Sequence, residues 1–261
     1  WSVLPTVLLA TQTYWLGLGT ATALAGAMWA LVTSDRCDNR RIWLFGFFAG
    51  CMLLARTMAI GFVPGLVLAG VIVAGAERRR LMRLAGAFGV ALVVAGPWWA
   101  VEWTTITDYL LGYGYGTRAG LFGQGGVPER LGLRLSRIVH GVGQPVVVSC
   151  LVLAVVAAVM ARRRRTVPPA WREGLALAAM FVAGIAALTS TSNTGVWFEL
   201  PLIAVIVPLG AAIVSSLPRP VAAIPVVPLI GMALVQLPIV WWWIPPSTEG
   251  IPWVAPSEIH G

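Results

Sequence analysis

"IWLFGFFAGCMLLARTMAIGFVPGLVLAGVIVAG", residues 42–75, is an apolar stretch of 34 residues in which Arg56 carries the single charge. It lies between two arginine-rich segments, "SDRCDNRR" at 34–41 and "AERRRLMR" at 76–83. One long helix would place these segments on opposite faces of a membrane, whereas two antiparallel arms keep both on one face. Because arginine-rich loops stay on the cytoplasmic side, we predict a short helical hairpin that turns at Arg56–Thr57 with its tip outward.

The composition of the whole chain supports a membrane protein. The 261 residues are 58% hydrophobic and 11% charged, with a mean hydropathy of +0.84. Soluble globular domains carry about 25% charged residues, so this chain needs lipid as the solvent for much of its surface. Disordered proteins are excluded as a class, because they are poor in apolar residues.

Eight segments are long and apolar enough to be predicted as transmembrane helices. They are 14–33, 42–55, 57–75, 84–99, 145–161, 174–190, 199–217 and 221–243. The sequence therefore predicts an all-α polytopic membrane protein with one transmembrane domain over residues 1–261. It also predicts a long external loop at 100–144 and an external tail at 244–261. Because the chain starts at Trp1 rather than Met, we expect it to be the C-terminal portion of a longer protein.

The distribution of arginine agrees with this topology. All 18 basic residues are arginine, and 13 of them fall in the connections that alternation of eight spans puts on one side. The positive-inside rule makes that side the cytoplasm. The net charge of +8 is thereby explained without nucleic acid, which we exclude as a partner. The other five arginines fall on the outer side: Arg56, Arg118, Arg130, Arg134 and Arg137.

Arg56 is the most informative of these outer arginines. A charged side chain at the centre of a membrane helix costs at least about 2.5 kcal/mol, and a position at a hairpin tip near the interface reduces that cost. One interpretation is a side chain that anchors the tip at the interface. The other is a ligand for phosphate or carboxylate, since the planar guanidinium group matches both.

The segment "YLLGYGYGTRAG", residues 109–120, lies in the long outer connection and is predicted to be a loop. Its glycines permit unusual dihedral angles and close approach of the backbone. Tyr113 and Tyr115 offer flat faces and hydroxyl groups that suit stacking on sugar rings. Arg118 follows directly. A flexible aromatic loop at the membrane surface, without a ligand, is the alternative.

Two further outer segments carry charge. Residues 128–140, "PERLGLRLSRIVH", place Arg130, Arg134 and Arg137 at helical spacing, which predicts an amphipathic helix on the outer leaflet with its arginines at anionic headgroups or at an anionic substrate. Loop 189–201 contains Asn193, a turn former, and Glu199 at the mouth of a span. Glu199 either meets the helix dipole or contributes to binding or catalysis.

Three stretches, in this order, resemble the GT-C fold of polytopic lipid-linked glycosyltransferases, and in particular the bacterial members of the family 39 group related to aminoarabinose transferases and protein O-mannosyltransferases. They are "GFFAGCMLLARTMAIGFVPGLVLAG" at 46–70, "AGPWWAVEWTTITDYLLGYGYG" at 95–116 and "TSNTGVWFELPLIAVIVPL" at 191–209. The resemblance covers about residues 40–220, and it depends on the order of the segments and on the topology more than on any one motif.

The resemblance implies a multi-pass enzyme of the bacterial inner membrane that moves a sugar from a polyprenyl-phosphate donor to an acceptor on the outer face. It implies donor-phosphate contacts at Arg56 and Arg118. It further implies a sugar or acceptor site at Tyr109, Tyr113, Tyr115, Asn193 and Glu199. The general base of the family lies in a first external loop that has no counterpart here, so we expect the catalytic acid upstream of residue 1.

Other interpretations stay open at this point. A lipid-linked sugar flippase or transporter, and a non-catalytic membrane subunit, are the alternatives to an enzyme. No cofactor is indicated, because the three cysteines, Cys37, Cys51 and Cys150, have no metal-ligand spacing and no other pattern supports a divalent metal. The expected partners are membrane lipids and a polyprenyl-phosphate sugar. The identity of the sugar and the acceptor is not encoded in any motif.

Overall fold

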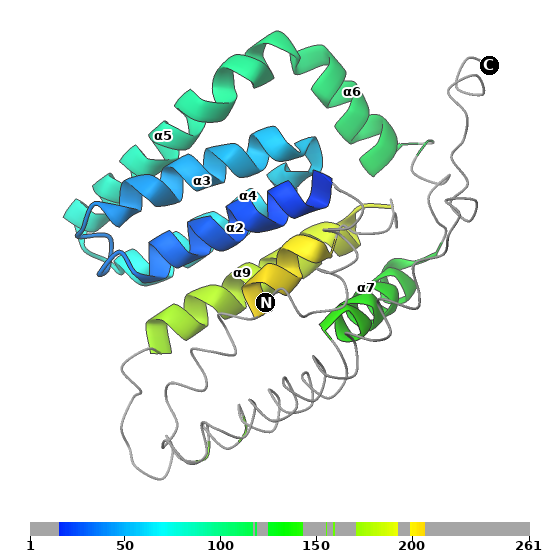
Figure 1. Ribbon diagram of the computed structural model, residues 1–261. Coiled ribbons are helices and arrows are strands. Elements are labelled where there is room, and N and C mark those ends of the chain that lie inside the picture. The colour runs from blue at the N-terminus through cyan, green and yellow to red at the C-terminus, as the bar shows by residue number, and fades with distance from the viewer. Residues whose placement is uncertain are drawn as a thin grey trace, which may run out of the picture.

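The computed structural model describes residues 16–116, 118, 125–142, 155, 159, 171–192 and 199–206, and the regular elements in these ranges are all helices (Figure 1). The all-α prediction is confirmed for this part of the chain. In chain order the helices are α2 (Leu16–Val32), α3 (Arg41–Ala55), the 3-10 helix η1 (Thr57–Phe62), α4 (Val63–Ala74), α5 (Arg78–Val101), α6 (Trp103–Gly114), α7 (Val127–Val142) and α9 (Trp171–Ser190). Residues 200–206 are helical as well.

Among the described residues, three helices are long and apolar enough to cross a membrane. They are Thr57–Ala74, Arg78–Val101 and Trp171–Ser190, and two shorter apolar helices cover Gly17–Val32 and Arg41–Ala55. The protein therefore has the helices of a membrane protein. The predicted span at 221–243, the tail 244–261, most of 199–217 and all of 145–161 except residues 155 and 159 lie outside the described residues. The count of eight spans stays a prediction.

The structure places a break in the apolar stretch 42–75 at the predicted position. Helix α3 ends at Ala55, and Arg56 has the extended dihedral angles φ −160° and ψ 129°. The chain then continues through η1 into α4, where Pro64 occupies the first turn, a position in which proline removes no helical hydrogen bond. The side chain of Arg56 thus stands at the joint between the two arms.

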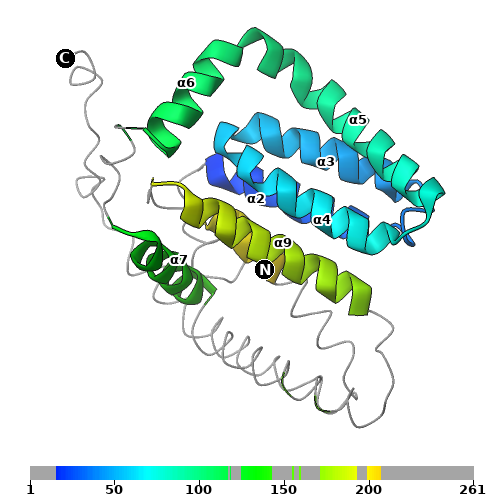
Figure 2. The same ribbon diagram turned by 180° about the vertical axis from the view of Figure 1, so that it is seen from behind.

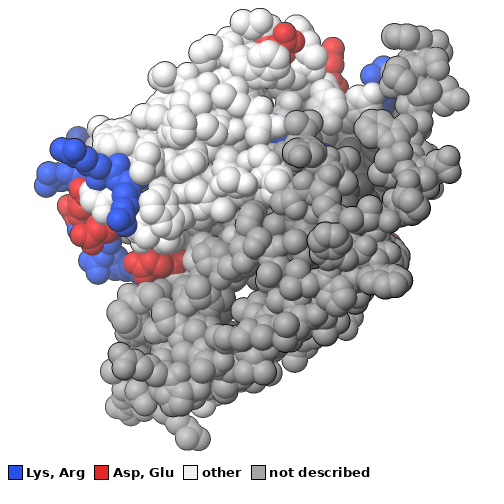
Figure 3. Space-filling view, viewed as in Figure 1, with Lys and Arg blue, Asp and Glu red and all other residues white. Residues whose placement is uncertain are grey.

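The two arginine-rich turns of this hairpin lie at the same end of the molecule. The Asp38 carboxylate, from the α2–α3 turn, pairs with Arg80 and Arg83 of α5 at 2.9 and 2.8 Å. The Arg172 guanidinium at the start of α9 reaches the α4–α5 turn, 3.5 Å from where a Cβ on Gly75 would stand. Figure 3 shows this basic end as a cluster of arginine and acidic side chains, beside a surface that is largely uncharged. The break at Arg56 and the shared end of the two basic turns are as predicted, and the outward direction of the hairpin tip stays a prediction.

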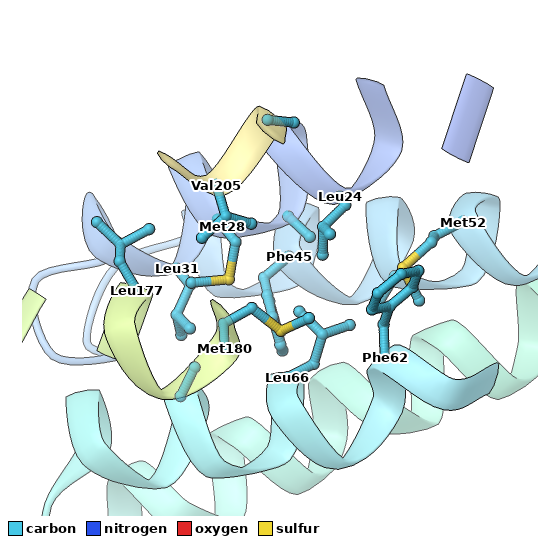
Figure 4. Packing of buried hydrophobic residues seen from close by; sticks show 14 of the residues in the cluster. Leu24, Met28, Leu31, Phe45, Met52, Phe62, Leu66, Leu177, Met180 and Val205 are labelled. Carbon is cyan, nitrogen blue, oxygen red and sulfur yellow. The ribbon is translucent and has the colours of Figure 1, made fainter. Parts of the chain in front are cut away.

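The core lies where α2, α3, α4 and α9 meet. Met28, Phe45, Leu66 and Met180 point toward one another from these four helices (Figure 4), and all four side chains are buried. Seen from the front or from behind, α3, α2 and α4 lie between α5 on one side and α9 on the other (Figure 2).

Small residues allow the helices to approach closely. A Cβ on Gly46 of α3 would overlap the backbone carbonyl oxygen of Ala87 on α5, and a Cβ on Gly50 would come within 2.7 Å of Val94. Between α2 and α3, a Cβ on Gly26 would stand 2.9 Å from the Phe48 ring. Small residues at such crossings are typical of helix packing in membranes, where close contact replaces the hydrophobic driving force.

The outer connection 100–144 differs from the predicted loop. Helix α5 continues past Pro97 to Val101, and at Glu102 the chain turns into α6. The segment "YLLGYGYG" is helical through Gly114, so its interpretation as a loop is wrong for Tyr109 and Tyr113. The helix ends there because the N–H groups of Tyr115 and Gly116 both donate to the Leu111 carbonyl.

Replacing Gly46 tests the α3–α5 contact. We expect Gly46→Ala to lower the free energy of unfolding by about 2 kcal/mol, since overpacking of a tight interface costs about 1–3 kcal/mol. The matched control is Gly89→Ala on α5, where nothing lies within 4 Å of the new methyl group and alanine favours the helix. Thermal unfolding in detergent measures both, and equal stability of the two variants would contradict the close approach.

Labelling of single cysteines tests the sidedness. In a background without the three native cysteines, we expect a membrane-impermeant maleimide to reach Arg40→Cys and Arg79→Cys from the cytoplasm. Asp108→Cys should react from outside, because the positive-inside rule assigns the basic end to the cytoplasm and α6 lies at the other end. All three positions are exposed. Labelling of Arg79→Cys and Asp108→Cys from the same side would exclude this topology.

Candidate functional site

The end of the molecule opposite the basic turns collects polar side chains from four separate segments. The first segment is the joint at Arg56, and the second is the last turn of α6. The third is helix α7, and the fourth comprises the end of α9 and Glu199, which follows it in the chain. Four of the five outer arginines belong to this group, which we call the outer cluster: Arg56, Arg130, Arg134, Arg137 and Glu199.

Glu199 is the centre of the outer cluster. Its side chain is 4% exposed, and its Oε1 atom accepts from Nη1 of Arg134 at 2.5 Å and from Nη1 of Arg137 at 3.5 Å. The Arg134 side chain is fully buried, whereas that of Arg137 is 29% exposed. A charge is buried at this depth only when an opposite charge compensates it. The pair therefore fixes α7 against the helix that begins after Glu199.

Arg56 lies close enough to this pair for their charges to act on it. Burial lowers the pKa of the half-buried Arg56 guanidinium; Tyr109 and Glu199 act to raise it, and Arg134 acts to lower it. Two other guanidinium groups thus share the surroundings of a single carboxylate with Arg56. Of the predicted site residues, Tyr109 and Glu199 are the two whose charges act on the pKa of Arg56.

Arg130 joins three segments through the backbone. Its Nη1 atom donates to the Thr191 carbonyl at 2.7 Å and to the Ser192 hydroxyl at 3.3 Å. The N–H group of Ser192 in turn donates to the Gly114 carbonyl at 2.9 Å. The ends of α6 and α9 and the first turns of α7 are therefore held in one place.

The predicted orientation of α7 is wrong. The helix forms at the predicted position, but Arg130 and Arg134 face α9 and Glu199 instead of lipid headgroups. Leu131 and Leu135 are exposed instead. An amphipathic helix at a membrane surface can turn its apolar face to lipid while its charged side chains pair with groups of the protein. Helical period alone does not distinguish this orientation from the predicted one.

The tyrosines of α6 form a second group. The rings of Tyr109 and Tyr113 lie 5.1 Å apart between centroids, and the Arg118 guanidinium carbon lies 5.6 Å from the centroid of Tyr113, within range of a cation–π contact. Arg118 is exposed and stacks on a tyrosine, so the structure groups it with Tyr113 and not with Glu199. Asn193 lies outside the described residues.

An apolar cavity of about 250 Å³ adjoins the outer cluster. Its walls come from η1, which follows Arg56 directly, from the end of α6, and from the end of α9. Tyr115, whose hydroxyl lies 3.3 Å from that of Ser190, and Thr191 form its polar border. The lining residues are Met58, Ile60, Gly61, Phe62, Leu110, Leu111, Tyr115, Ala187, Leu188 and Thr191.

These features suit a ligand with an anionic head and an apolar body. Guanidinium groups bind phosphate and carboxylate through directed, charge-assisted hydrogen bonds, and a low-dielectric site strengthens them. The cavity offers apolar contact within one helical turn of Arg56. Within the described ranges, no group of three or more His, Cys, Asp and Glu side chains is placed to hold a metal ion.

The role of Arg134 was missed at the sequence level, although a signal was present. Arg134 is the middle one of three arginines that recur on one helical face, and Glu199 is an acid at the mouth of a predicted span. A buried acid requires a buried base, and this complementarity points to the pair.

Comparison of the chain with protein-family models, with curated proteins and with solved structures found no match.

Replacing Arg134 tests the buried pair. We expect Arg134→Gln to lower the free energy of unfolding by about 3 kcal/mol, because it leaves the Glu199 carboxylate buried without its main partner. Arg118→Gln, at an exposed arginine, is the control and should change stability little. In a double-mutant cycle, Arg134→Gln with Glu199→Gln should cost less than the sum of the two changes. Additive losses in thermal unfolding would show that the two side chains do not interact.

Proposed function

We propose that this chain belongs to a membrane glycosyltransferase of the GT-C type, which moves a sugar from a polyprenyl-phosphate donor to an acceptor on the outer face of a bacterial inner membrane. The observation that carries the proposal is the outer cluster beside the apolar cavity. Two arginines, Arg134 and Arg137, pair with one buried acid, Glu199, near a cavity whose walls are apolar. A lipid-linked sugar phosphate has the matching chemistry, since it joins an anionic head to an apolar chain.

In this proposal Arg56 contacts the donor phosphate, with Arg118 as a second candidate at the rim. Negative charge develops on the phosphate as the glycosidic bond breaks, and fixed guanidinium groups stabilise it without reorganisation. The walls of the sugar or acceptor site would come from Tyr109, Tyr113, Tyr115, Asn193 and Glu199. The apolar cavity would take the first part of the lipid chain.

The distribution of charge supports a transferase over a flippase or transporter. In the three described helices that are long enough to span a membrane, charged residues occur only in the first six positions, at the basic end. Transporters bind their substrates near the middle of the bilayer, often at broken helices. In these three helices the charged groups thus keep away from the middle, as expected for chemistry at an interface.

The test is sugar transfer by the natural full-length protein, reconstituted with a labelled polyprenyl-phosphate sugar. We expect Arg56→Ala to lower the transfer rate about 100-fold or more, the loss typical of removing one group that stabilises developing negative charge. Arg79→Ala, an exposed arginine of the basic end, is the matched control and should leave the rate unchanged.

Equal rates for Arg56→Ala and the wild type would reduce Arg56 to an anchor of the hairpin tip. Movement of the labelled lipid across the bilayer without transfer would favour the flippase instead.

A further inference from the structure

The exposed face of α3 begins with two arginines and continues with apolar side chains. Arg40 is the N-cap residue of this helix and has helical dihedral angles, and Arg41 is its first residue. Both are exposed. Three apolar residues follow on the face of Arg40 at helical spacing. They are Leu44, Phe47 and Leu54, and each is between 43% and 46% exposed.

Two tryptophans lie beside the start of this face, one on α2 and one that contacts α5. The guanidinium carbon of Arg41 lies over the Trp29 ring of α2, 5.5 Å from its centroid. The Trp43 ring extends toward α5, where a Cβ on Gly86 would stand 3.0 Å from it. Trp29 and Trp43 are 49% and 46% exposed. Exposed tryptophans are typical of the level at which lipid headgroups meet hydrocarbon, so the two arginines lie at headgroup level.

The Arg41 guanidinium is held in position by the protein. In addition to its contact with the Trp29 ring, its Nη1 atom donates to the Thr33 carbonyl at 3.3 Å. That bond uses one of the five N–H donors of a guanidinium group, so the group can bind a phosphate oxygen at the same time. Asp38, an acid of the same turn, pairs with two arginines of α5.

Helix α3 is short for a membrane. Its 15 residues rise about 1.5 Å each and span about 22 Å, whereas the hydrocarbon core of a bilayer is about 30 Å thick. A short apolar helix is accommodated by local thinning of the bilayer and by flanking charged side chains that reach the headgroups. Arg40 and Arg41 are the flanking residues at the start of α3, so headgroups of that leaflet are drawn to them.

We propose that this face of α3 is a binding site for one anionic phospholipid of the leaflet at the basic end. The headgroup phosphate binds Arg40 and Arg41 through charge-assisted hydrogen bonds, and an acyl chain runs along the apolar residues of the same face. Figure 3 shows the arginines of this end beside a surface that is largely uncharged. A soluble polyanion would match the charges but would leave the apolar residues without a partner, so a lipid fits the surface better.

This inference goes beyond the proposed function and does not rest on it. The site lies at the end of the molecule opposite the outer cluster. Helix α3 ends at Ala55, directly before Arg56. A lipid bound at the start of α3 therefore fixes the depth of this helix in the membrane, and it takes no part in chemistry at the outer end.

Thermal unfolding of the purified protein in a non-ionic detergent tests the site. We expect phosphatidylglycerol to raise the melting temperature of the wild type by about 3 °C more than phosphatidylcholine does, because a ligand of the folded state stabilises it. In the double variant Arg40→Gln with Arg41→Gln, this difference should disappear. The matched control is Arg78→Gln with Arg79→Gln, which removes the same charge from exposed residues of the same end and should keep the difference.

Each protein is compared with itself in the two lipids, so a general loss of stability does not affect the result. Equal loss of the difference in both double variants would show attraction by overall charge and overturn the site. Equal shifts with the two lipids in the wild type would overturn it as well. Glycerol 3-phosphate and single-stranded RNA at the same concentration should give no shift, and a shift as large as that with phosphatidylglycerol would assign the surface to a soluble anion.

Photo-cross-linking tests the apolar part of the site. Phosphatidylglycerol with a diazirine in one acyl chain should label the peptide that contains Phe47 several-fold more in the wild type than in the Arg40→Gln and Arg41→Gln double variant, as measured by mass spectrometry. Leu92, which is exposed on α5, is the control position and should be labelled equally in both proteins. Equal labelling at Phe47 would show that the two arginines do not hold the lipid there, and the proposal would be wrong.

Discussion

A guanidinium group cannot be left in lipid without an acid or an interface to receive it, and this constraint organises the whole structure. The chain has 18 arginines, 10 acids and no lysine. The described helices place these charges at two ends. At the basic end, many arginines lie in turns, and water solvates their guanidinium groups. At the outer end, few arginines are present and one of them is fully buried, so a specific acid must supply the compensation.

The two ends use the same chemistry with different consequences. Asp38 pairs with Arg80 and Arg83 while its side chain remains 33% exposed, so water and salt screen the interaction and it contributes little beyond alignment. Glu199 pairs with Arg134 at almost no exposure. In that environment the interaction is strong and its loss is costly. The pairing of Asp38 with Arg80 and Arg83 holds two turns together. The Glu199 carboxylate compensates the buried charge of Arg134, which lipid would not solvate.

Much of the fold follows from the sequence because lipid imposes simple rules. The break at Arg56 was predictable, since two basic turns had to share one face. The helical period of 128–140 was predictable too, but the face that meets the protein was not, because period alone does not tell whether the apolar side meets protein or lipid.

Residues 109–114 were wrongly predicted as part of a loop. Glycines favour loops in water, yet glycine is more frequent in transmembrane helices than in soluble ones. The pairing of Glu199 with α7 joins residues more than 60 positions apart, and no local pattern fixes such a contact. The place of Asn193 stays a prediction.

The contact between Gly46 and Ala87 has a consequence for the apolar cavity. At this contact the backbones of α3 and α5 meet directly, so no side chain can rearrange there. Helix α5 is therefore held at a fixed distance from α3. Helix α6 follows α5 at Glu102 and supplies one wall of the cavity. The 3-10 helix η1 follows α3 at Arg56 and supplies another wall. The width of the cavity therefore depends on where α6 leaves α5 and where η1 leaves α3. Widening the cavity beyond what its lining side chains allow requires movement of a helix.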